Sequence, residues 1–211
     1  MKGIVISSGS IENYDLLKEH IMENQFILCA DGGVRHIMRI GSIPNSVIGD
    51  FDSIDEISIK FIRENNIPVI EYPVEKNETD TELAMLYLIN LGCNEITFAG
   101  VTGSRLDHTL ANIYLLRKLL LQNIKGKIVD DNNTIYLIND YLKLEKRENY
   151  YVSIIPISNE GVTVTLKGFY YPLSEELVGF NSTLGVSNKI IDMVGEINII
   201  KGEALIIESK D

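Results

Sequence analysis

Residues 95–123 read EITFAGVTGSRLDHTLANIYLLRKLLLQN: a short β-rich run, a loop with two glycines and a long helical pattern. Four more pairs of a β-rich run and a helical run precede this one, at residues 3–8 and 14–24, 26–30 and 33–40, 46–50 and 55–65, and 67–72 and 79–90. Five such units in series predict an α/β fold in which a mostly parallel sheet carries helices on both faces.

The pattern changes after about residue 130. Five β-rich runs follow, separated by Gly, Asn and Ser and without a long helical period, at residues 127–138, 150–158, 161–168, 189–202 and 204–209. They predict a smaller antiparallel β-sandwich domain. We read Asp130, Asp131, Asn132 and Asn133 as a turn at the hinge, which gives an α/β domain of residues 1–130 and a β-sandwich domain of residues 131–211.

Composition narrows the class of protein. The 211 residues are 45% hydrophobic, which is enough for a folded core, and the formal net charge is -11. That charge argues against a nucleic-acid backbone or an anionic membrane as the main partner. No run approaches the ~18 apolar residues of a membrane helix, and the apolar run at the N-terminus is too short for a signal peptide. We therefore expect a soluble, cytoplasmic protein, with Cys29 and Cys93 as buried free thiols.

Four polar motifs follow predicted strands, at the edge where ligands bind in such sheets. They are ADGG (30–33), GDFDS (49–53), the loop before Thr79, and GVTGSRLDH (100–108). Each motif has a purely structural interpretation beside a functional one.

GDFDS supplies two carboxylates, Asp50 and Asp52. The stretch can be a turn, with Ser53 and Glu56 forming a capping box for the next helix. Alternatively, carboxylates this close together at a strand end can bind one hard cation through oxygen.

The stretch before residue 80 adds a third carboxylate and a cation. Thr79 and Glu82 have capping-box spacing, so Asp80 can simply favour the helix dipole, or it can be a further metal ligand. Lys76 is either an ordinary solvated lysine or a phosphate ligand near a helix N-terminus.

In GVTGSRLDH, Gly100 and Gly103 permit tight turns and close approach to a ligand. Arg105 offers a rigid fork of donors for phosphate oxygens, although it could merely pair with Asp107. Asp107 is a natural N-cap and His108 a first-turn residue, both with possible ligand contact. Neither GxxxxGK[ST] nor GxGxxG occurs here, so a Walker-type or standard dinucleotide site is not supported.

ADGG places Asp31 at another strand end, followed by Gly32 and Gly33. The motif is either a glycine-assisted turn or a close approach of backbone to phosphate, with Asp31 orienting a metal-bound water or a basic side chain. One rim would then hold the charge pattern expected for Mg²⁺ and a polyphosphate. Its members would be Asp31, Asp50, Asp52, Asp80, Lys76 and Arg105.

Five motifs, in their sequence and their order, resemble the thiamine pyrophosphokinase family along nearly the whole chain. They are CADGG, GDFDS, KNETDTELA, GVTGSRLDH and, in the second half, GVSN. The resemblance implies an enzyme that makes thiamine diphosphate and AMP from thiamine and ATP with Mg²⁺. It also implies a homodimer with active sites between the subunits.

The resemblance further implies roles for individual residues. Metal-binding and catalytic positions would be Asp50, Asp52 and Asp80, with Arg105 also catalytic. ATP-binding positions would be Asp31, Gly32, Lys76, Asn77, Gly103, Arg105, Asp107 and His108. Thiamine-binding positions, contributed by the partner subunit, would be Thr183, Ser187 and Asn188. Some members of the family have a tryptophan near the thiamine ring; this chain has none, so an aliphatic or tyrosine wall must substitute.

Two other functions fit the same motifs. One is pyrophosphoryl transfer to another hydroxymethyl heterocycle, such as a pterin. The other is a non-catalytic Mg-nucleotide sensing module whose sandwich transmits binding to a partner.

Overall fold

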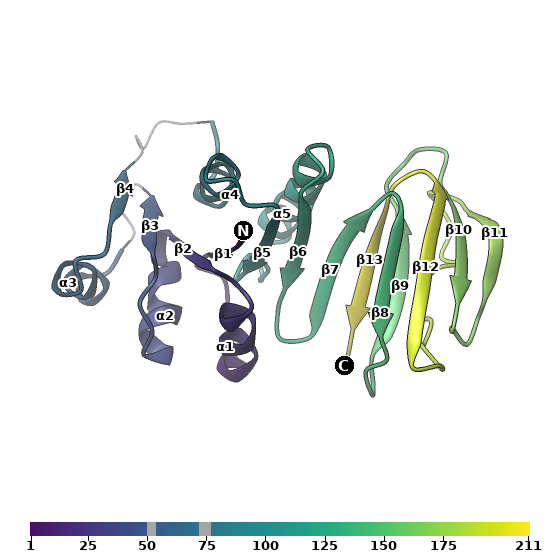
Figure 1. The fold of residues 1–211 in the computed structure, drawn as a ribbon, viewed down its shortest axis with the longest axis horizontal. Coiled ribbons are helices and arrows are strands. Elements are labelled where there is room, and N and C mark those ends of the chain that lie inside the picture. Colours follow the sequence, from purple (N-terminus) through teal and green to yellow (C-terminus); the bar gives the residue numbers. More distant parts are fainter. Residues whose placement is uncertain (50–53, 72–76) are drawn as a thin grey trace. The chain divides into compact units, whose positions relative to one another are not determined.

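The structure, a computed structural model, describes residues 1–49, 54–71 and 77–211 (Figure 1). The chain forms two compact units, Met1–Asp131 and Asn132–Asp211. The division falls one residue after the boundary drawn from the sequence.

The first unit alternates strands and helices. In chain order these are β1 (Lys2–Ile6), α1 (Tyr14–Met22), β2 (Phe26–Ala30), the 3-10 helix η1 (Asp31–Gly33), α2 (Val34–Ile40), β3 (Ser46–Gly49), α3 (Glu56–Glu64), β4 (Val69–Glu71), α4 (Asp80–Asn90), β5 (Glu95–Ala99), α5 (Leu106–Leu120) and β6 (Lys125–Val129). Within this unit the strand order is β4-β3-β2-β1-β5-β6, and all neighbouring strands are parallel. The predicted parallel sheet is confirmed.

The strand order reverses between β1 and β5. The chain moves outward from β1 to β4, then crosses back through α4 to β5 on the other side of β1. Right-handed crossovers in opposite directions place helices on opposite faces, and Figure 1 shows α1 and α2 on one face with α4 and α5 on the other. In such a sheet the crevice beyond the carboxyl ends of the two central strands is the expected ligand site.

The core of the first unit explains why its strands are continuous apolar runs. Helices cover both faces, so successive side chains of β1, Ile4, Val5 and Ile6, are all fully buried. Cys29 and Cys93 are buried free thiols, as predicted, and burial raises the pKa of the Cys29 thiol.

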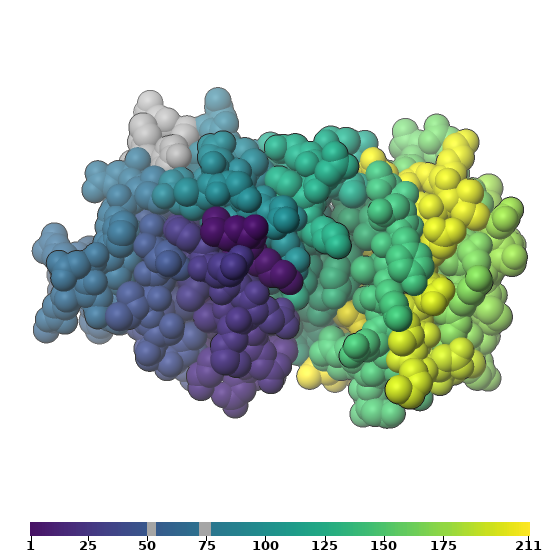
Figure 2. All heavy atoms as spheres, in the orientation of Figure 1, coloured from purple at the N-terminus to yellow at the C-terminus, as the bar shows by residue number. Residues whose placement is uncertain are grey.

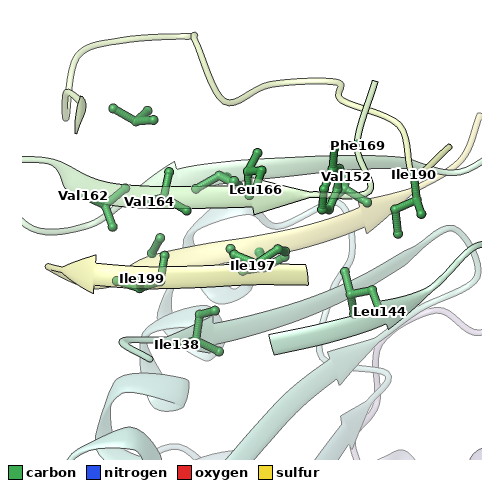
Figure 3. Close-up of a cluster of buried hydrophobic side chains, with 14 residues drawn as sticks. Ile138, Leu144, Val152, Val162, Val164, Leu166, Phe169, Ile190, Ile197 and Ile199 are labelled. Atoms are coloured by element: carbon green, nitrogen blue, oxygen red, sulfur yellow. The ribbon is translucent and has the colours of Figure 1, made fainter. Parts of the chain in front are cut away.

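The second unit contains only strands, in two antiparallel sheets. They are β7 (Asn133–Ile138), β8 (Tyr141–Glu145), β9 (Tyr151–Pro156), β10 (Val162–Lys167), β11 (Leu173–Val178), β12 (Val194–Lys201) and β13 (Ala204–Ser209). Strands β7, β13 and β9 pair in that order, and the other sheet has the order β11-β10-β12-β8. Buried side chains from both sheets, among them Ile138, Val164 and Ile197, form one core (Figure 3). The predicted sandwich architecture is confirmed.

Two strands of this unit were not predicted. They are β8 and β11. Strand β11 is exposed along most of its length, so it lacks the alternation of apolar and polar residues that marks a half-buried strand. Glu175 within β11 has a φ of 52° and the pairing with β10 is irregular. The run at residues 127–138 also proves to be two strands, β6 and β7.

Two of the three predicted helix caps are wrong. Helix α3 is capped by Asp55, whose carboxylate accepts a hydrogen bond from Ser58 N at 2.9 Å, and Ser53 lies outside the described residues. Helix α5 begins at Leu106, so Asp107 occupies the first turn, where a carboxylate favours the helix dipole. Thr79 does cap α4, accepting from Glu82 N at 3.2 Å.

Helices α1 and α2 lie side by side at the surface of the first unit, where Figure 2 shows them in purple and blue. Arg39 of α2 lies over the Tyr14 ring of α1, 4.3 Å from its centroid. Within the described part of the chain, every helix is too short or too polar to cross a membrane.

Candidate active site

A cleft of about 280 Å³ lies at the reversal point of the parallel sheet. Its walls are residues 7–10, which follow β1, and residues 100–105, which follow β5. Thr81 from α4 and three side chains of α5, His108, Thr109 and Asn112, complete the lining. The cleft therefore occupies the place at which the fold predicts a ligand.

Among the described residues, the lining is rich in hydroxyl groups and includes no carboxylate. Its hydroxyl residues are Ser7, Ser8, Ser10, Thr81, Thr102, Ser104 and Thr109. Among the lining residues Arg105 is the permanent positive charge, and none of them is acidic. Hydroxyl and guanidinium donors suit an anionic ligand such as a phosphate chain.

Residues 7–10 were not among the predicted site residues. They read SSGS and directly follow the first strand, so small polar residues at a strand end were a visible signal. What the sequence pattern could not supply is the strand order, which makes β1 and β5 neighbours and brings residues 7–10 beside residues 100–105.

Ser7 connects the end of β1 to helix α4. Its side chain is buried, and its Oγ lies 2.9 Å from Thr81 Oγ1 in a hydrogen bond. Thr81 follows Asp80, the carboxylate predicted to bind metal, which is half-buried in the first turn of α4. The Ser7–Thr81 contact therefore fixes the start of α4 against the central strand.

The two glycines of the GVTGSR loop have different roles. Gly100 has a φ of 66°, and a Cβ there would strike the carbonyl oxygen of Ser7, so both its conformation and its close packing require glycine. Gly103 has open space around its Cα, which leaves its backbone accessible from the cleft. Thr109 Oγ1 holds the loop by accepting from Gly103 N and donating to Arg105 O, each at 3.2 Å.

Arg105 pairs with Asp107, as the structural alternative in the sequence analysis proposed. Arg105 Nη2 lies 2.6 Å from Asp107 Oδ2, and Nε lies 3.3 Å from Oδ1. This hydrogen bond raises the pKa of Arg105 and lowers the pKa of Asp107. Both side chains remain about two-thirds exposed, at 68% and 64%, so the guanidinium stays accessible at the mouth of the cleft.

The ADGG motif lies at the ends of β2 and β3. Asp31 has a φ of 47°, and its Oδ1 lies against Gly49, the last residue of β3. A Cβ on Gly33 would strike the carbonyl oxygen of Ile6, so the close approach at Gly33 is to strand β1. Gly32 faces Ser8 with more room, since a Cβ there would lie 3.6 Å from Ser8 Cβ.

Asp50, Asp52 and Lys76 lie outside the described residues. Of the predicted carboxylate ligands on this rim, the structure therefore describes Asp31 and Asp80. Among residues 1–49, 54–71 and 77–211 there is no group of three or more His, Cys, Asp or Glu side chains that could hold a metal ion. Asn77, predicted to bind ATP, is exposed just before α4.

The predicted thiamine residues lie together in the second unit. Asn188 is buried, and its amide accepts from Tyr171 N at 3.0 Å and donates to Tyr171 O at 2.8 Å. Thr183 and Ser187 are exposed, and Ser187 has a φ of 59°. Asn188 thus shapes the loop, while the two hydroxyl residues face solvent.

Two family models match the chain in succession. Residues 17–128 match the thiamin pyrophosphokinase catalytic domain, and residues 140–202 match the thiamin pyrophosphokinase vitamin B1 binding domain. Thiamine pyrophosphokinase of Bacillus subtilis (strain 168) is 35% identical over 215 residues, with all of both chains covered. The chain belongs to the thiamine pyrophosphokinase family.

Solved structures agree with this assignment. The crystal structure of thiamine pyrophosphokinase from Bacillus subtilis has a TM-score of 0.91 at 32% identity, with 100% of each chain covered. That of thiamin pyrophosphokinase from Geobacillus thermodenitrificans has a TM-score of 0.85 at 29% identity, covering 100% of this chain and 98% of that one. The resemblance read from the motifs is confirmed, and membership of the thiamine pyrophosphokinase family disfavours both the pterin enzyme and the sensing module.

Proposed function

We propose that this protein transfers a pyrophosphoryl group from ATP to the primary hydroxyl of thiamine, giving thiamine diphosphate and AMP. The observation that carries the proposal is the similarity to thiamine pyrophosphokinase of Bacillus subtilis, which extends over the whole length of both chains. Each unit of the structure also matches a thiamin pyrophosphokinase family model of its own, since the two matches fall on either side of the division at residues 131 and 132.

ATP would bind in the cleft at the reversal point, with its phosphates near Arg105. Support comes from the hydroxyl-rich lining, the accessible backbone at Gly103 and the exposed guanidinium. His108 lines the same cleft. Further contacts in this proposal are Asp31, Gly32, Lys76, Asn77 and Asp107.

Asp50, Asp52 and Asp80 would hold Mg²⁺. Carboxylates are the hard oxygen donors that Mg²⁺ prefers. Asp31 Oδ1 lies against Gly49, so the structure places a carboxylate oxygen at the carboxyl end of β3. When bound, Mg²⁺ would neutralise charge on the phosphate oxygens.

The remaining catalysis would be positioning and charge stabilisation by side chains. The thiamine hydroxyl oxygen forms a bond to the β-phosphorus while the bond from that phosphorus to the oxygen of the α-phosphate breaks. The hydroxyl proton is released and AMP leaves with the bonding electrons. Arg105 would donate to oxygens of the transferring group, and the rigid loop would hold it in line with the attacking hydroxyl.

Thiamine would contact Thr183, Ser187 and Asn188 of the partner subunit in a cytoplasmic homodimer. Four large side chains of the second unit support an apolar contact surface, because each is more than half exposed: Tyr170, Tyr171, Leu177 and Phe180. Tyr170 and Tyr171 meet edge to face at 4.8 Å, so they could supply the aromatic wall that a chain without tryptophan needs.

The product of the reaction tests the proposal. Purified protein is incubated with Mg-ATP and thiamine, and the nucleotides and thiamine esters are separated. AMP together with thiamine diphosphate supports the proposal, and both should disappear when EDTA removes the metal. ADP would indicate simple phosphoryl transfer, and absence of turnover would contradict the proposed activity.

A further inference from the structure

One wall of the cleft is an irregular segment held by side chains from distant parts of the chain. Residues 8–13, which lead from Ser7 to the start of α1, form neither helix nor strand. Ser8, Gly9 and Ser10 line the cleft from this segment. A loop without regular secondary structure keeps one geometry only if other groups bind its backbone.

Helix α2 binds the first part of the segment. Arg35 donates a hydrogen bond to the carbonyl oxygen of Ser8. His36 Nε2 donates to Gly9 O at 2.9 Å, and its Nδ1 lies 2.9 Å from Tyr14 Oη, from which it accepts a hydrogen bond when the ring is neutral. Burial lowers the pKa of His36 and so favours this neutral form.

Asp131 binds the other end of the segment. Its Oδ2 accepts from Glu12 N at 2.9 Å, and its Oδ1 accepts from Asn13 N at 2.8 Å. Asn13 is the N-cap of α1 and accepts from Leu16 N at 3.1 Å. One carboxylate thus uses both oxygens to hold two consecutive amides at the start of a helix, more than a hundred residues away in sequence.

Asp130, the residue before Asp131, holds the opposite wall of the cleft. Asp130 Oδ2 accepts from Thr102 Oγ1 at 3.1 Å, and Thr102 lines the cleft from the loop after β5. The two walls also bond each other directly, through Gly9 N and Gly100 O at 2.7 Å. The acidic pair that follows β6 is therefore fixed to both walls at once.

We propose that Asp131 is a positioning residue for the nucleotide, which fixes residues 8–13 through the amides of Glu12 and Asn13 and thereby sets the shape of the cleft. This inference rests on the proposed function, because it takes the cleft to be the ATP site. Asp131 does not line that cleft, so its effect would be indirect.

The test compares Asp131→Ala with Asp15→Ala. Asp15 is a matched control, since it is an exposed carboxylate in the first turn of α1 whose ion pair with Lys18 spans 3.3 Å. The dissociation constant of Mg-ATP is measured by calorimetry without thiamine, and KM for each substrate and kcat are measured with it. Hydrogen exchange reports the amides of Glu12 and Asn13 directly.

Asp131→Ala should weaken Mg-ATP binding about tenfold, because binding must then order residues 8–13 without the hydrogen bonds to a charged group that order them in the wild type. It should raise KM for ATP in proportion and speed exchange at Glu12 and Asn13. KM for thiamine and kcat should change less than about twofold, because the reacting groups keep their own contacts. Asp15→Ala should match the wild type in all of these measurements.

Equal Mg-ATP affinity in the two variants would overturn the positioning role. So would a fall in kcat with unchanged KM values, because that pattern indicates a smaller folded fraction. Asp131→Asn, which retains one acceptor oxygen, should give an intermediate affinity; an affinity as weak as that of Asp131→Ala in a folded protein would contradict the two-amide account. Failure of the proposed function is distinguishable, since it appears as wild-type protein that forms no AMP and thiamine diphosphate.

Discussion

Arg105 is the residue whose chemistry the cleft most directly uses. Its guanidinium is held by Asp107 at the mouth of the hydroxyl-rich cleft. Such an ion pair at an exposed surface contributes little to stability. It does orient the planar fork of donors, and orientation is what a phosphate ligand requires.

Arg105→Lys should therefore reduce kcat/KM for ATP by about 10-fold to 100-fold while leaving the melting temperature unchanged. A lysine keeps the charge, but its ammonium cannot reproduce two parallel hydrogen bonds. Steady-state kinetics and a thermal melt of the same preparation check this. Lys118→Arg, a change of cation at the pair with Glu82 on α4, is the control and should retain wild-type kinetics. An Arg105→Lys enzyme with normal kcat/KM would remove Arg105 from phosphate binding.

His36 makes a pH-dependent contribution to stability. Its pKa is lowered below the ordinary value of 6.5, because burial disfavours the charged ring and Arg35 and Arg39 repel a further proton, although the bond to Gly9 opposes this. Between the lowered pKa and 6.5 the unfolded chain binds more protons than the folded protein does. The free energy of unfolding should therefore fall as the pH drops below about 6.5, by at most about 1.4 kcal/mol per pH unit for one histidine.

His36→Gln should make that dependence shallower. Glutamine can still donate to Gly9 O but does not titrate. Urea unfolding of both proteins at several pH values between 5 and 7.5 measures the slopes. The variant should retain some slope, because burial also lowers the pKa of His20. Identical slopes in the two proteins would mean that His36 titrates normally in the folded state.

At the scale of elements, helix α4 depends on its cap for the placement of Asp80. Thr79 accepts from Glu82 N, and Asp80 is the first helical residue. Thr79→Ala should lower the free energy of unfolding by about 1 kcal/mol. It should also raise the Mg²⁺ concentration needed for half-maximal turnover, because fraying of the first turn releases a proposed ligand. Thr79→Ser preserves the cap and should behave as the wild type; if the alanine variant has an unchanged Mg²⁺ requirement, Asp80 does not depend on the cap.

The elements also show what the sequence could and could not predict. Each strand–helix pair of the first unit was predictable, because buried parallel strands are apolar throughout and helices keep their own period. The exposed edge strand β11 was not, since little of it is buried. The rim of polar motifs could be predicted from the strand ends. The cleft at residues 7–10 could not, because it depends on the pairing of β1 with β5, which belongs to the tertiary structure.

Local contacts also explain why the N-caps of α3 and α5 differ from the predicted ones. Asp55 caps α3 because its carboxylate accepts from both Ser58 N and Ser58 Oγ, at 2.9 and 2.8 Å. Asp107 is drawn into the pair with Arg105 instead of capping α5. The spacing of residues in the sequence does not reveal which hydrogen-bond partners compete for a capping side chain.

For the whole molecule, each unit has a hydrophobic core of its own. One buried cluster of the first unit includes Ile4, Val34 and Val47, and the cluster of the second unit includes Val164 and Ile197. All residues that line the candidate ATP cleft belong to the first unit. Stability and nucleotide affinity should therefore be separable by mutation.

Ile197→Ala provides the test, because Ile197 is fully buried in the core of the second unit. The substitution should lower the free energy of unfolding by about 2–5 kcal/mol through lost contacts and a residual cavity. The dissociation constant of Mg-ATP should nevertheless stay within about twofold of the wild type. ATP at about 100 times that constant should stabilise both proteins equally, by about 2.7 kcal/mol. Calorimetric titration and thermal unfolding with and without nucleotide measure these quantities. If Ile197→Ala weakened ATP binding as much as Asp131→Ala does, the nucleotide site would depend on the second unit, and assigning it to residues 1–131 would be wrong.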